Sequence, residues 1–363
     1  MEPSSEFTFL AVCCRRTFTA NSGALRPPDA DALNWDRLLR LARYHRVQGL
    51  LWKGLGSLNS QIPPKIADEL ASDARMIAAY NLRAAAECGK LAEGFAERGI
   101  DVLFIKGLTL AKLAYGDCMG KSGSDIDILI DPDRLRETAD LLAKRGYRSI
   151  DPGPATPPAA LSAWHEFCKE SLWGNAAGLK VDLHTQLADS PKLIPSIGPN
   201  SSRQSVVIAG GAYLPTLGDE ELFAYLAVHG ASCAWFRLKW LTDFAAFADR
   251  LGPAKLDAFY RRSLELGAGR PAAQALLLAD RVYNLLEQAP DLAAQLAKDR
   301  VNQWLADAAF NQVAGAREPV EPTKRPLGTA RMHYTQLALI PGPRFVISEV
   351  IRKAGAFIRR IRF

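Results

Sequence analysis

The stretch from Val102 to Asp131, VLFIKGLTLAKLAYGDCMGKSGSDIDILID, sets the predicted fold. Its apolar, β-prone beginning predicts a strand over 102–105, and the lysine–glycine pair that follows predicts a turn. The pattern then predicts a helix over 108–115, a loop of small residues, and a second strand over 125–130. The segment is therefore expected to form a strand, a turn, a helix, a loop and a second strand.

The second of these strands carries a pair of acids. Because side chains alternate along a strand, Asp125 and Asp127 are expected on one face and the neighbouring isoleucines on the other. The two acids would project about 6 to 7 Å apart, a gap that one or two hard cations can fill. A solvated edge strand, or two aspartates that cap loops, is the alternative. Lys106 and Gly107 favour a metal site, because a helix N-terminus that follows a strand can bind phosphate.

The lysine–glycine turn, a tyrosine and the sequence DIDILI together resemble the polymerase-beta-type nucleotidyltransferase superfamily, and within it a group of uncharacterised bacterial nucleotidyltransferases. The resemblance extends to W-D-x-L-L-x-L-A near the N-terminus, to VDLH over 181–184 and to W-x-R-L-K-W-L-x-D over 235–243. It implies an α+β fold, in which a small mixed-sheet nucleotidyltransferase core is flanked by N-terminal helices and a C-terminal helical bundle.

A third carboxylate is expected on a neighbouring strand. Residues 166–173 and 179–183 predict a hairpin in which Asp182 points away from the apolar side chains beside it. Taken alone, Asp182 would be predicted to be a surface residue of the strand. The group of nucleotidyltransferases that this chain resembles, however, carries an acid followed by Leu-His at this place. His184 shares the face of Asp182 and is expected to orient a carboxylate or the acceptor, or to be structural.

The resemblance implies a two-metal site. Asp125, Asp127 and Asp182 would be both the catalytic residues and the ligands of two Mg²⁺ ions, with Mn²⁺ as the alternative ion. One ion would lower the pKa of the acceptor hydroxyl, and the other would neutralise charge as pyrophosphate leaves.

The resemblance also assigns residues to a nucleoside triphosphate, for which ATP is favoured. The superfamily has Gly-Ser at the first turn, whereas this chain has Lys106-Gly107, so these two residues are expected at the triphosphate. Lys121 stands where the group often has an arginine. Ser122 and Ser124 could complete the phosphate cradle through their amides and hydroxyls.

Two basic residues in the C-terminal half are further candidates. Arg237 and Lys239 recur beside tryptophans in a helical segment, which suggests a second wall of the cleft that faces phosphate, with an aromatic ring on the base. The alternative is an ion pair with Asp243 and tryptophans in the core. His45 and Arg46 are expected in the core or on the surface, with ligand contact as the lesser alternative.

Length and composition predict a substantial core and either two domains or one domain with large helical additions. The chain has 363 residues, 48% of them apolar, and a net charge of +6, which permits a polyanionic partner without requiring one. Six scattered cysteines form no C-x-x-C pair and predict reduced, mostly buried thiols. No apolar run reaches the length of about 18 residues that a membrane span needs, and no secretory signal is evident, so we expect a cytoplasmic protein.

The chain divides into five predicted regions. A helix is expected to begin at Asn34, which can cap it, and to continue through WDRLLRLARYHRVQGLLWKGL. The N-terminal helices are expected to precede the chemistry rather than supply it. The regions are a loose N-terminal arm (1–33), N-terminal helices (34–99), the catalytic core (100–217), a helical domain (218–316), and a linker with a basic amphipathic C-terminal helix (317–363).

The C-terminal helix, expected over 344–363, mixes arginines and lysine with apolar side chains. Such a helix could touch a membrane surface, RNA or an acidic acceptor, although docking by its apolar stripe is favoured.

The leading hypothesis is transfer of a nucleoside monophosphate to an acceptor hydroxyl with release of pyrophosphate. A small molecule or a peptide or protein is favoured as the acceptor over RNA. The alternatives are phosphoryl transfer on the same scaffold, and a non-catalytic nucleotide- or RNA-binding protein.

Overall fold

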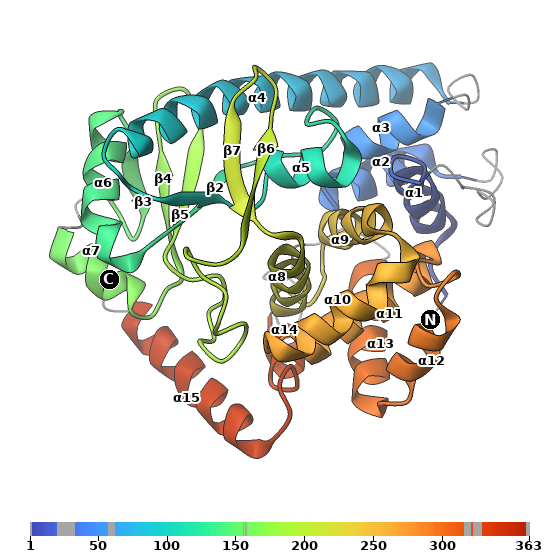
Figure 1. Ribbon diagram of the computed structural model, residues 1–363. Helices are drawn as coiled ribbons and strands as arrows, with labels where there is room; N and C mark the ends of the chain where they lie inside the picture. The colour runs from blue at the N-terminus through green and yellow to red at the C-terminus, as the bar shows by residue number, and fades with distance from the viewer. Residues whose placement is uncertain are drawn as a thin grey trace.

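The computed structural model describes residues 2–19, 33–56, 62–154, 156, 158–315, 321 and 329–360. Figure 1 shows a mixed α+β fold, in which a β-sheet lies beside a large group of helices. The α+β class expected from the sequence is confirmed. None of the helices described is long and apolar enough to span a membrane.

The sheet has five strands in the order β1-β2-β5-β4-β3. Strand β2 runs parallel to β5, whereas the other neighbouring strands are antiparallel. Strands β6 and β7 form a separate hairpin. The strands are β1 Val102–Phe104, β2 Ile126–Ile130, β3 Arg148–Asp151, β4 Glu170–Gly174, β5 Lys180–His184, β6 Arg203–Val207 and β7 Tyr213–Leu217.

The two faces of β2 belong to two different hydrophobic cores. Ile126, Ile128 and Ile130 pack in one core with side chains of helices α4 (Pro64–Ala96) and α6 (Leu135–Lys144). Leu129 points to the opposite face and joins the larger core of the helical half. The alternation expected in the DIDILI segment is therefore present, and Asp127 lies on the same face as Leu129, opposite the isoleucines.

In the N-terminal half, α4 and α6 pack against the sheet, whereas the helices that precede α4 lie with the C-terminal helices. Helix α4 crosses the upper edge of the molecule in Figure 1, from the N-terminal helices to α6. Short helices precede or connect the strands. They are α1 Ser5–Arg15, α2 Trp35–Tyr44, α3 Gln48–Leu55, α5 Leu108–Tyr115, the 3₁₀ turn Pro132–Arg134 and α7 Pro158–His165.

The N-terminus differs from the loose arm that the sequence suggested. Residues Ser5–Arg15 form helix α1, whose side chains are almost all buried, and Ser4 caps it by accepting a hydrogen bond from the Phe7 amide. A helix that is buried on every side has no polar face, so its sequence lacks the amphipathic period by which a surface helix is recognised. Residues 20–32 of the expected arm lie outside the described residues.

The helix expected to run on from Asn34 is two helices. Asn34 does cap the first, because its Oδ1 accepts a hydrogen bond of 2.9 Å from the Arg37 amide. Helix α2 then ends at Tyr44, and α3 begins at Gln48. Arg46 between them has a φ of 57°, the left-handed conformation, which an α-helix does not contain.

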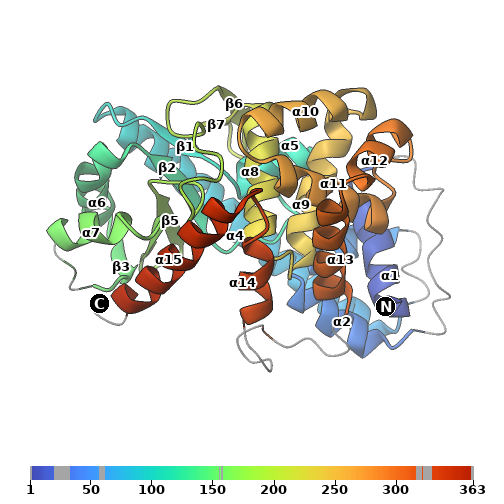
Figure 2. The same cartoon turned by 90° about the horizontal axis from the view of Figure 1, so that it is seen from below.

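The C-terminal half is a helical bundle on the side of the sheet where α1 to α3 also lie (Figures 1 and 2). The nearly complete burial of α8 and α9 makes these helices its centre. The helices of the bundle are α8 Asp219–Ser232, α9 Leu238–Leu251, α10 Pro253–Glu265, α11 Gly269–Tyr283, α12 Pro290–Ala297, α13 Arg300–Ala314 and α14 Ala330–Gln336. The last helix, α15 Pro343–Arg360, runs away from the bundle toward α7 (Figures 1 and 2). The linker expected over 317–326 lies, apart from Glu321, outside the described residues.

Helix α15 is less completely docked than the sequence suggested. Phe345 and Glu349 are buried, but Ile347 and Ile351 are 60% and 67% exposed. Only part of the apolar stripe of α15 is therefore packed against the rest of the protein. Both views place α15 along the outside of the molecule (Figures 1 and 2).

Candidate metal and nucleotide site

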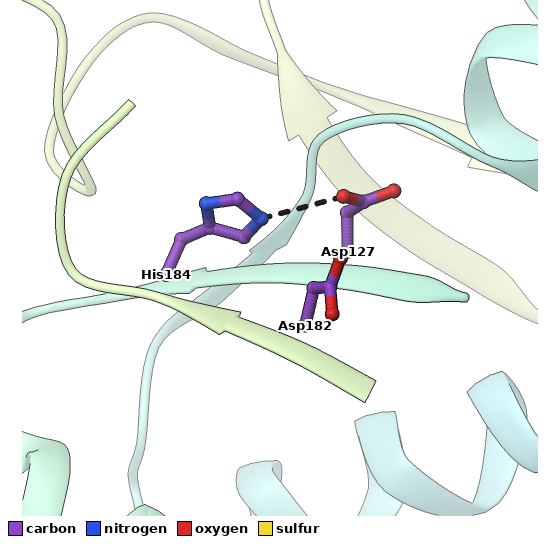
Figure 3. Close-up of side chains that lie close together, drawn as sticks. All are labelled: Asp127, Asp182 and His184. Atoms are coloured by element: carbon purple, nitrogen blue, oxygen red, sulfur yellow. Dashed lines mark hydrogen bonds and ion pairs between the residues drawn. The ribbon is translucent and has the colours of Figure 1, made fainter. Parts of the chain in front are cut away.

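The parallel pairing of β2 and β5 brings two carboxylates together. Asp127 lies opposite Asp182 in the register of these strands, and both side chains project from the same face (Figure 3). His184 follows two residues later on that face, and its Nε2 lies 3.3 Å from Asp127 Oδ1. One ligand atom from each of the three residues lies within 4.8 Å of the others. The three side chains thus form a group that could hold a metal ion.

Asp125 lies just before β2 and lines the same cavity as Asp127 and Asp182. Its Oδ2 accepts a hydrogen bond of 3.0 Å from the Ser124 hydroxyl. Asp125 is not part of the close group around His184. All three predicted carboxylates are therefore brought to one cavity, with Asp127 and Asp182 closest together.

Lys106 contacts a carboxylate in this structure. Its Nζ lies 2.6 Å from Asp127 Oδ1, and Asp127 is only 4% exposed. Burial alone would lower the pKa of Lys106, but the charge of Asp127 outweighs it and raises that pKa. Gly107, the next residue, is the N-cap of helix α5 and has a φ of 63°, a conformation that glycine adopts without strain.

The pKa values of Asp182 and Asp127 are shifted in opposite directions. Burial raises the pKa of Asp182 to about 8, and the charges of Asp127 and Asp125 add to this. Burial would also raise the pKa of Asp127, but Lys106 and the hydrogen bond from His184 outweigh it and hold that pKa well below its ordinary range. Without a cation, Asp127 is the ionised member of the pair and Asp182 the protonated one at neutral pH.

An open cavity lies in front of these carboxylates. Helix α9 contributes Lys239 and Trp240 to its wall. The sequence predicted that Lys239 would lie on a wall of the cleft. Charged side chains of both signs line it. The cations are Arg46, Lys106, Lys121, Lys169 and Lys239, and the carboxylates are Asp125, Asp127, Glu170, Asp182 and Asp243.

The predicted phosphate loop lines the cavity in part. Lys121 and Ser124 face the cavity, and Lys121 Nζ lies 3.4 Å from Asp243 Oδ2. The other oxygen of Asp243 accepts a hydrogen bond of 2.9 Å from the Tyr115 hydroxyl. Ser122 is buried outside the cavity lining, and its carbonyl oxygen accepts a hydrogen bond of 3.4 Å from Lys239.

Arg237 does not lie where the sequence suggested. Its guanidinium donates to the carbonyl oxygen of Tyr44, lies over the Tyr44 ring and forms an ion pair with Glu321 at 2.6 Å. Arg237 precedes the first residue of α9, whereas Lys239 lies within its first turn, so the two side chains point in different directions. Arg237 connects α9 to α2 and does not line the cavity, so the predicted contact with phosphate is wrong.

Sequence reasoning missed Lys169 and Glu170, which form an ion pair at the cavity. Glu170 is paired with His184 across β4 and β5, and its Oε2 lies 3.3 Å from His184 Nδ1. Burial lowers the pKa of His184, and a neutral imidazole donates through one nitrogen only. The proton is therefore assigned to Nε2, which donates to Asp127, whereas Nδ1 forms no hydrogen bond with Glu170. The predicted hairpin could have indicated Glu170, because it pairs the start of β4 with the end of β5, where His184 lies.

Asn81 of helix α4 was also missed, although it holds the phosphate loop. It is 2% exposed, and its Nδ2 lies 2.7 Å from the carbonyl oxygen of Cys118 and 2.8 Å from that of Lys121. Met119 offers a third carbonyl oxygen at 3.3 Å. The N-terminal helices therefore shape the site, contrary to the expectation that they only precede it.

Replacing Asn81 with alanine is expected to loosen this loop. Buried carbonyl groups would lose their donor, so we expect the free energy of unfolding to fall by about 2 kcal/mol. Amide hydrogen exchange across residues 118–124 should become faster. The neighbouring Leu82→Ala variant, whose side chain is 55% exposed, serves as the control. Unchanged exchange in the loop would contradict the role given to Asn81.

Carboxylates on neighbouring strands, beside a cavity lined by basic side chains, define a site of the kind that transfers phosphate-containing groups. A comparison with protein families agrees with this class. Residues 31–284, more than half of the chain, match the family described as uncharacterised nucleotidyltransferase. The chain belongs to this family, and the resemblance seen in the sequence is confirmed. A comparison with curated proteins finds no match.

Proposed function

We propose that this protein is a metal-dependent nucleotidyltransferase that transfers a nucleoside monophosphate from a nucleoside triphosphate to a hydroxyl group and releases pyrophosphate. The observation that carries the proposal is the placement of Asp127 beside Asp182 on parallel strands, facing a cavity with five basic side chains. Family membership supports nucleotidyl transfer as the general reaction.

The donor set fits a hard divalent cation. Asp127 and Asp182 offer carboxylate oxygens on one face, Asp125 lines the same cavity, and mutual repulsion contributes to the raised pKa of Asp182. A cation bound there would relieve this repulsion. We propose Mg²⁺, with Mn²⁺ as the alternative because His184 could add a nitrogen ligand. Bound ions would supply charge neutralisation and lower the pKa of the acceptor hydroxyl.

The residues of the chain have distinct parts in the proposed reaction. The acceptor oxygen attacks the α-phosphorus, the bond to the bridging oxygen breaks, and pyrophosphate leaves with the bonding electrons. Asp182, once a bound cation has ionised it, would accept the proton of the hydroxyl. His184 and Lys106 hold Asp127 in position from two sides, at 3.3 Å and 2.6 Å from its Oδ1.

A second, much smaller cavity adjoins the first. It shares Lys106, Asp125 and Asp127 with the first and is otherwise lined mainly by apolar side chains of α4, α5 and β7. The Tyr80 ring at this cavity, or Trp240 at the larger one, offers a surface on which a base can stack. We propose ATP as the favoured triphosphate. A small molecule or a peptide is the favoured acceptor, RNA is less favoured, and a cytoplasmic location stays a prediction.

The proposal is tested with the purified protein, each of the four nucleoside triphosphates, magnesium, and an extract of small molecules and peptides. We expect one triphosphate to release pyrophosphate and an acceptor to gain the mass of the nucleoside monophosphate. Release of nucleoside diphosphate instead would indicate phosphoryl transfer. Nucleotide binding that is insensitive to magnesium, without any product, would indicate a binding protein.

A further inference from the structure

The corner between α2 and α3 holds an arginine in an unfavourable conformation. The Arg46 amide donates to the Arg43 carbonyl, and the Val47 amide donates to the Ala42 carbonyl at 2.9 Å. These two bonds form the motif that commonly ends an α-helix, in which the left-handed residue is usually glycine. Arg46 occupies this position with a φ of 57°. Because a side chain disfavours this conformation, the fold gains nothing locally from arginine here.

This corner is attached to the beginning of α9. The Leu238 amide donates to His45 Nδ1 at 3.1 Å, and the Lys239 amide donates to the His45 carbonyl at 3.3 Å. The next residue after His45 is Arg46, so Arg46 and Lys239 belong to adjoining backbone segments. Both side chains line the larger cavity.

The same corner also lies against the phosphate loop. Gly49, in the first turn of α3, approaches the carbonyl oxygen of Gly120 so closely that any added Cβ would overlap it. Lys53 of α3 forms an ion pair with Asp117 at the start of that loop. Arg46 is thus held beside the loop that carries Lys121 and Ser124.

Arg46 and Lys239 differ from the other cations of the cavity. Lys106 is paired with Asp127, Lys121 with Asp243, and Lys169 with Glu170. Among the residues that the structure describes, no carboxylate forms an ion pair with Arg46 or Lys239. Burial lowers the pKa of Lys239 to about 8, and the charge of Lys121 lowers it further. The more distant charges of Asp243 and Asp125 oppose this shift, and Arg46 adds a smaller lowering. Two cations that form no direct ion pair with a described carboxylate thus face one cavity, and a bound anion could contact both of them.

We propose that Arg46 and Lys239 form an anion-binding pair for the β- and γ-phosphates of the nucleoside triphosphate. This inference rests on the proposed function and adds to it a residue from the N-terminal helices. The pair lines the same cavity as Asp127 and Asp182, and negative charge grows on the β- and γ-phosphates as pyrophosphate leaves. A guanidinium can bind two phosphate oxygens at once, which accounts for arginine at a place where glycine would be easier.

The decisive variant is Arg46→Gly, because glycine suits the backbone at this position. Its melting temperature is expected to equal or exceed that of the wild type. Calorimetric titration with magnesium-ATP and with magnesium-tripolyphosphate should show affinities about tenfold lower than in the wild type. The affinity for AMP, which lacks both outer phosphates, should change less than twofold. Arg46→Lys should recover part of the lost affinity.

Arg136→Ala is the matched control, because Arg136 is an exposed arginine on α6. It should bind both probes as the wild type does. Wild-type affinity for magnesium-ATP and tripolyphosphate in Arg46→Gly would overturn the inference. If the wild type released no pyrophosphate from any triphosphate, while Arg46→Gly still weakened tripolyphosphate binding, the proposed function would fail and the anion pair would stand. If the wild type turned over normally and Arg46→Gly bound both probes as the wild type does, the anion-binding pair would be rejected and the proposed function would be kept.

Discussion

Replacing Asp127 with asparagine is expected to reduce pyrophosphate release by at least about a thousandfold. Asp127 is central to the cluster, because it lies beside Asp182 and contacts both Lys106 and His184. Asparagine has almost the same shape but no charge, so it would hold a cation poorly. Initial rates of pyrophosphate release, measured with the triphosphate that the wild type uses, give the result.

The same substitution also leaves Lys106 without its nearest counter-ion. Removing one partner of a buried ion pair typically destabilises a protein by about 3 to 5 kcal/mol, so loss of activity alone could reflect unfolding. The double variant Lys106→Met/Asp127→Asn removes both charges and should recover most of the stability while staying inactive. Asp140→Asn, at an exposed position of α6, is the matched control and should keep full activity. A folded Asp127→Asn variant with wild-type turnover would falsify the proposed function.

Replacing Asp182 with asparagine is expected to stabilise the metal-free protein in a pH-dependent way. The pKa of Asp182 is raised from 3.8 to about 8 in the fold, chiefly by burial and then by Asp127 and Asp125. Between these two values the folded state binds a proton that the unfolded state has lost, so stability falls as the pH rises. Asparagine has no such proton. The stability advantage of the variant should therefore be small near pH 4 and grow to about 2 to 4 kcal/mol at pH 8.

Magnesium should reverse this order. A cation favours the ionised form of Asp182, so binding to the wild type should release a proton and become tighter as the pH rises toward 8. The variant loses a ligand and should gain little stability from magnesium. Thermal unfolding of both proteins across this pH range, with EDTA and then with excess magnesium, makes the comparison. A difference between wild type and variant that does not depend on pH would contradict the buried, protonated state of Asp182.

The strand alternation and the motifs in the sequence predict much of the catalytic face. The DIDILI run places Asp127 opposite the isoleucines because a strand has a period of two residues, and the structure buries those isoleucines against α4 and α6. The same argument predicts that Asp182 and His184 share a face, as Figure 3 shows. Periodicity is local, so it can be read without knowledge of neighbouring elements. Periodicity did not predict helix α1, because a helix that is buried on all sides has no repeating polar positions.

The contacts of the site depend on which elements become neighbours, and that is a property of the tertiary structure alone. The parallel pairing of β2 with β5 puts Asp127 beside Asp182, and the facing of β4 and β5 brings Glu170 to His184. Packing of α9 against the corner after α2 turns Arg237 toward Tyr44 and sets Arg46 beside Lys239. These residues are far apart in the chain, and the local sequence around each one does not indicate which residue it will contact. The amino-acid sequence by itself determined which side chains share a face of an element, whereas long-range packing decided which faces meet and which charges remain without a partner.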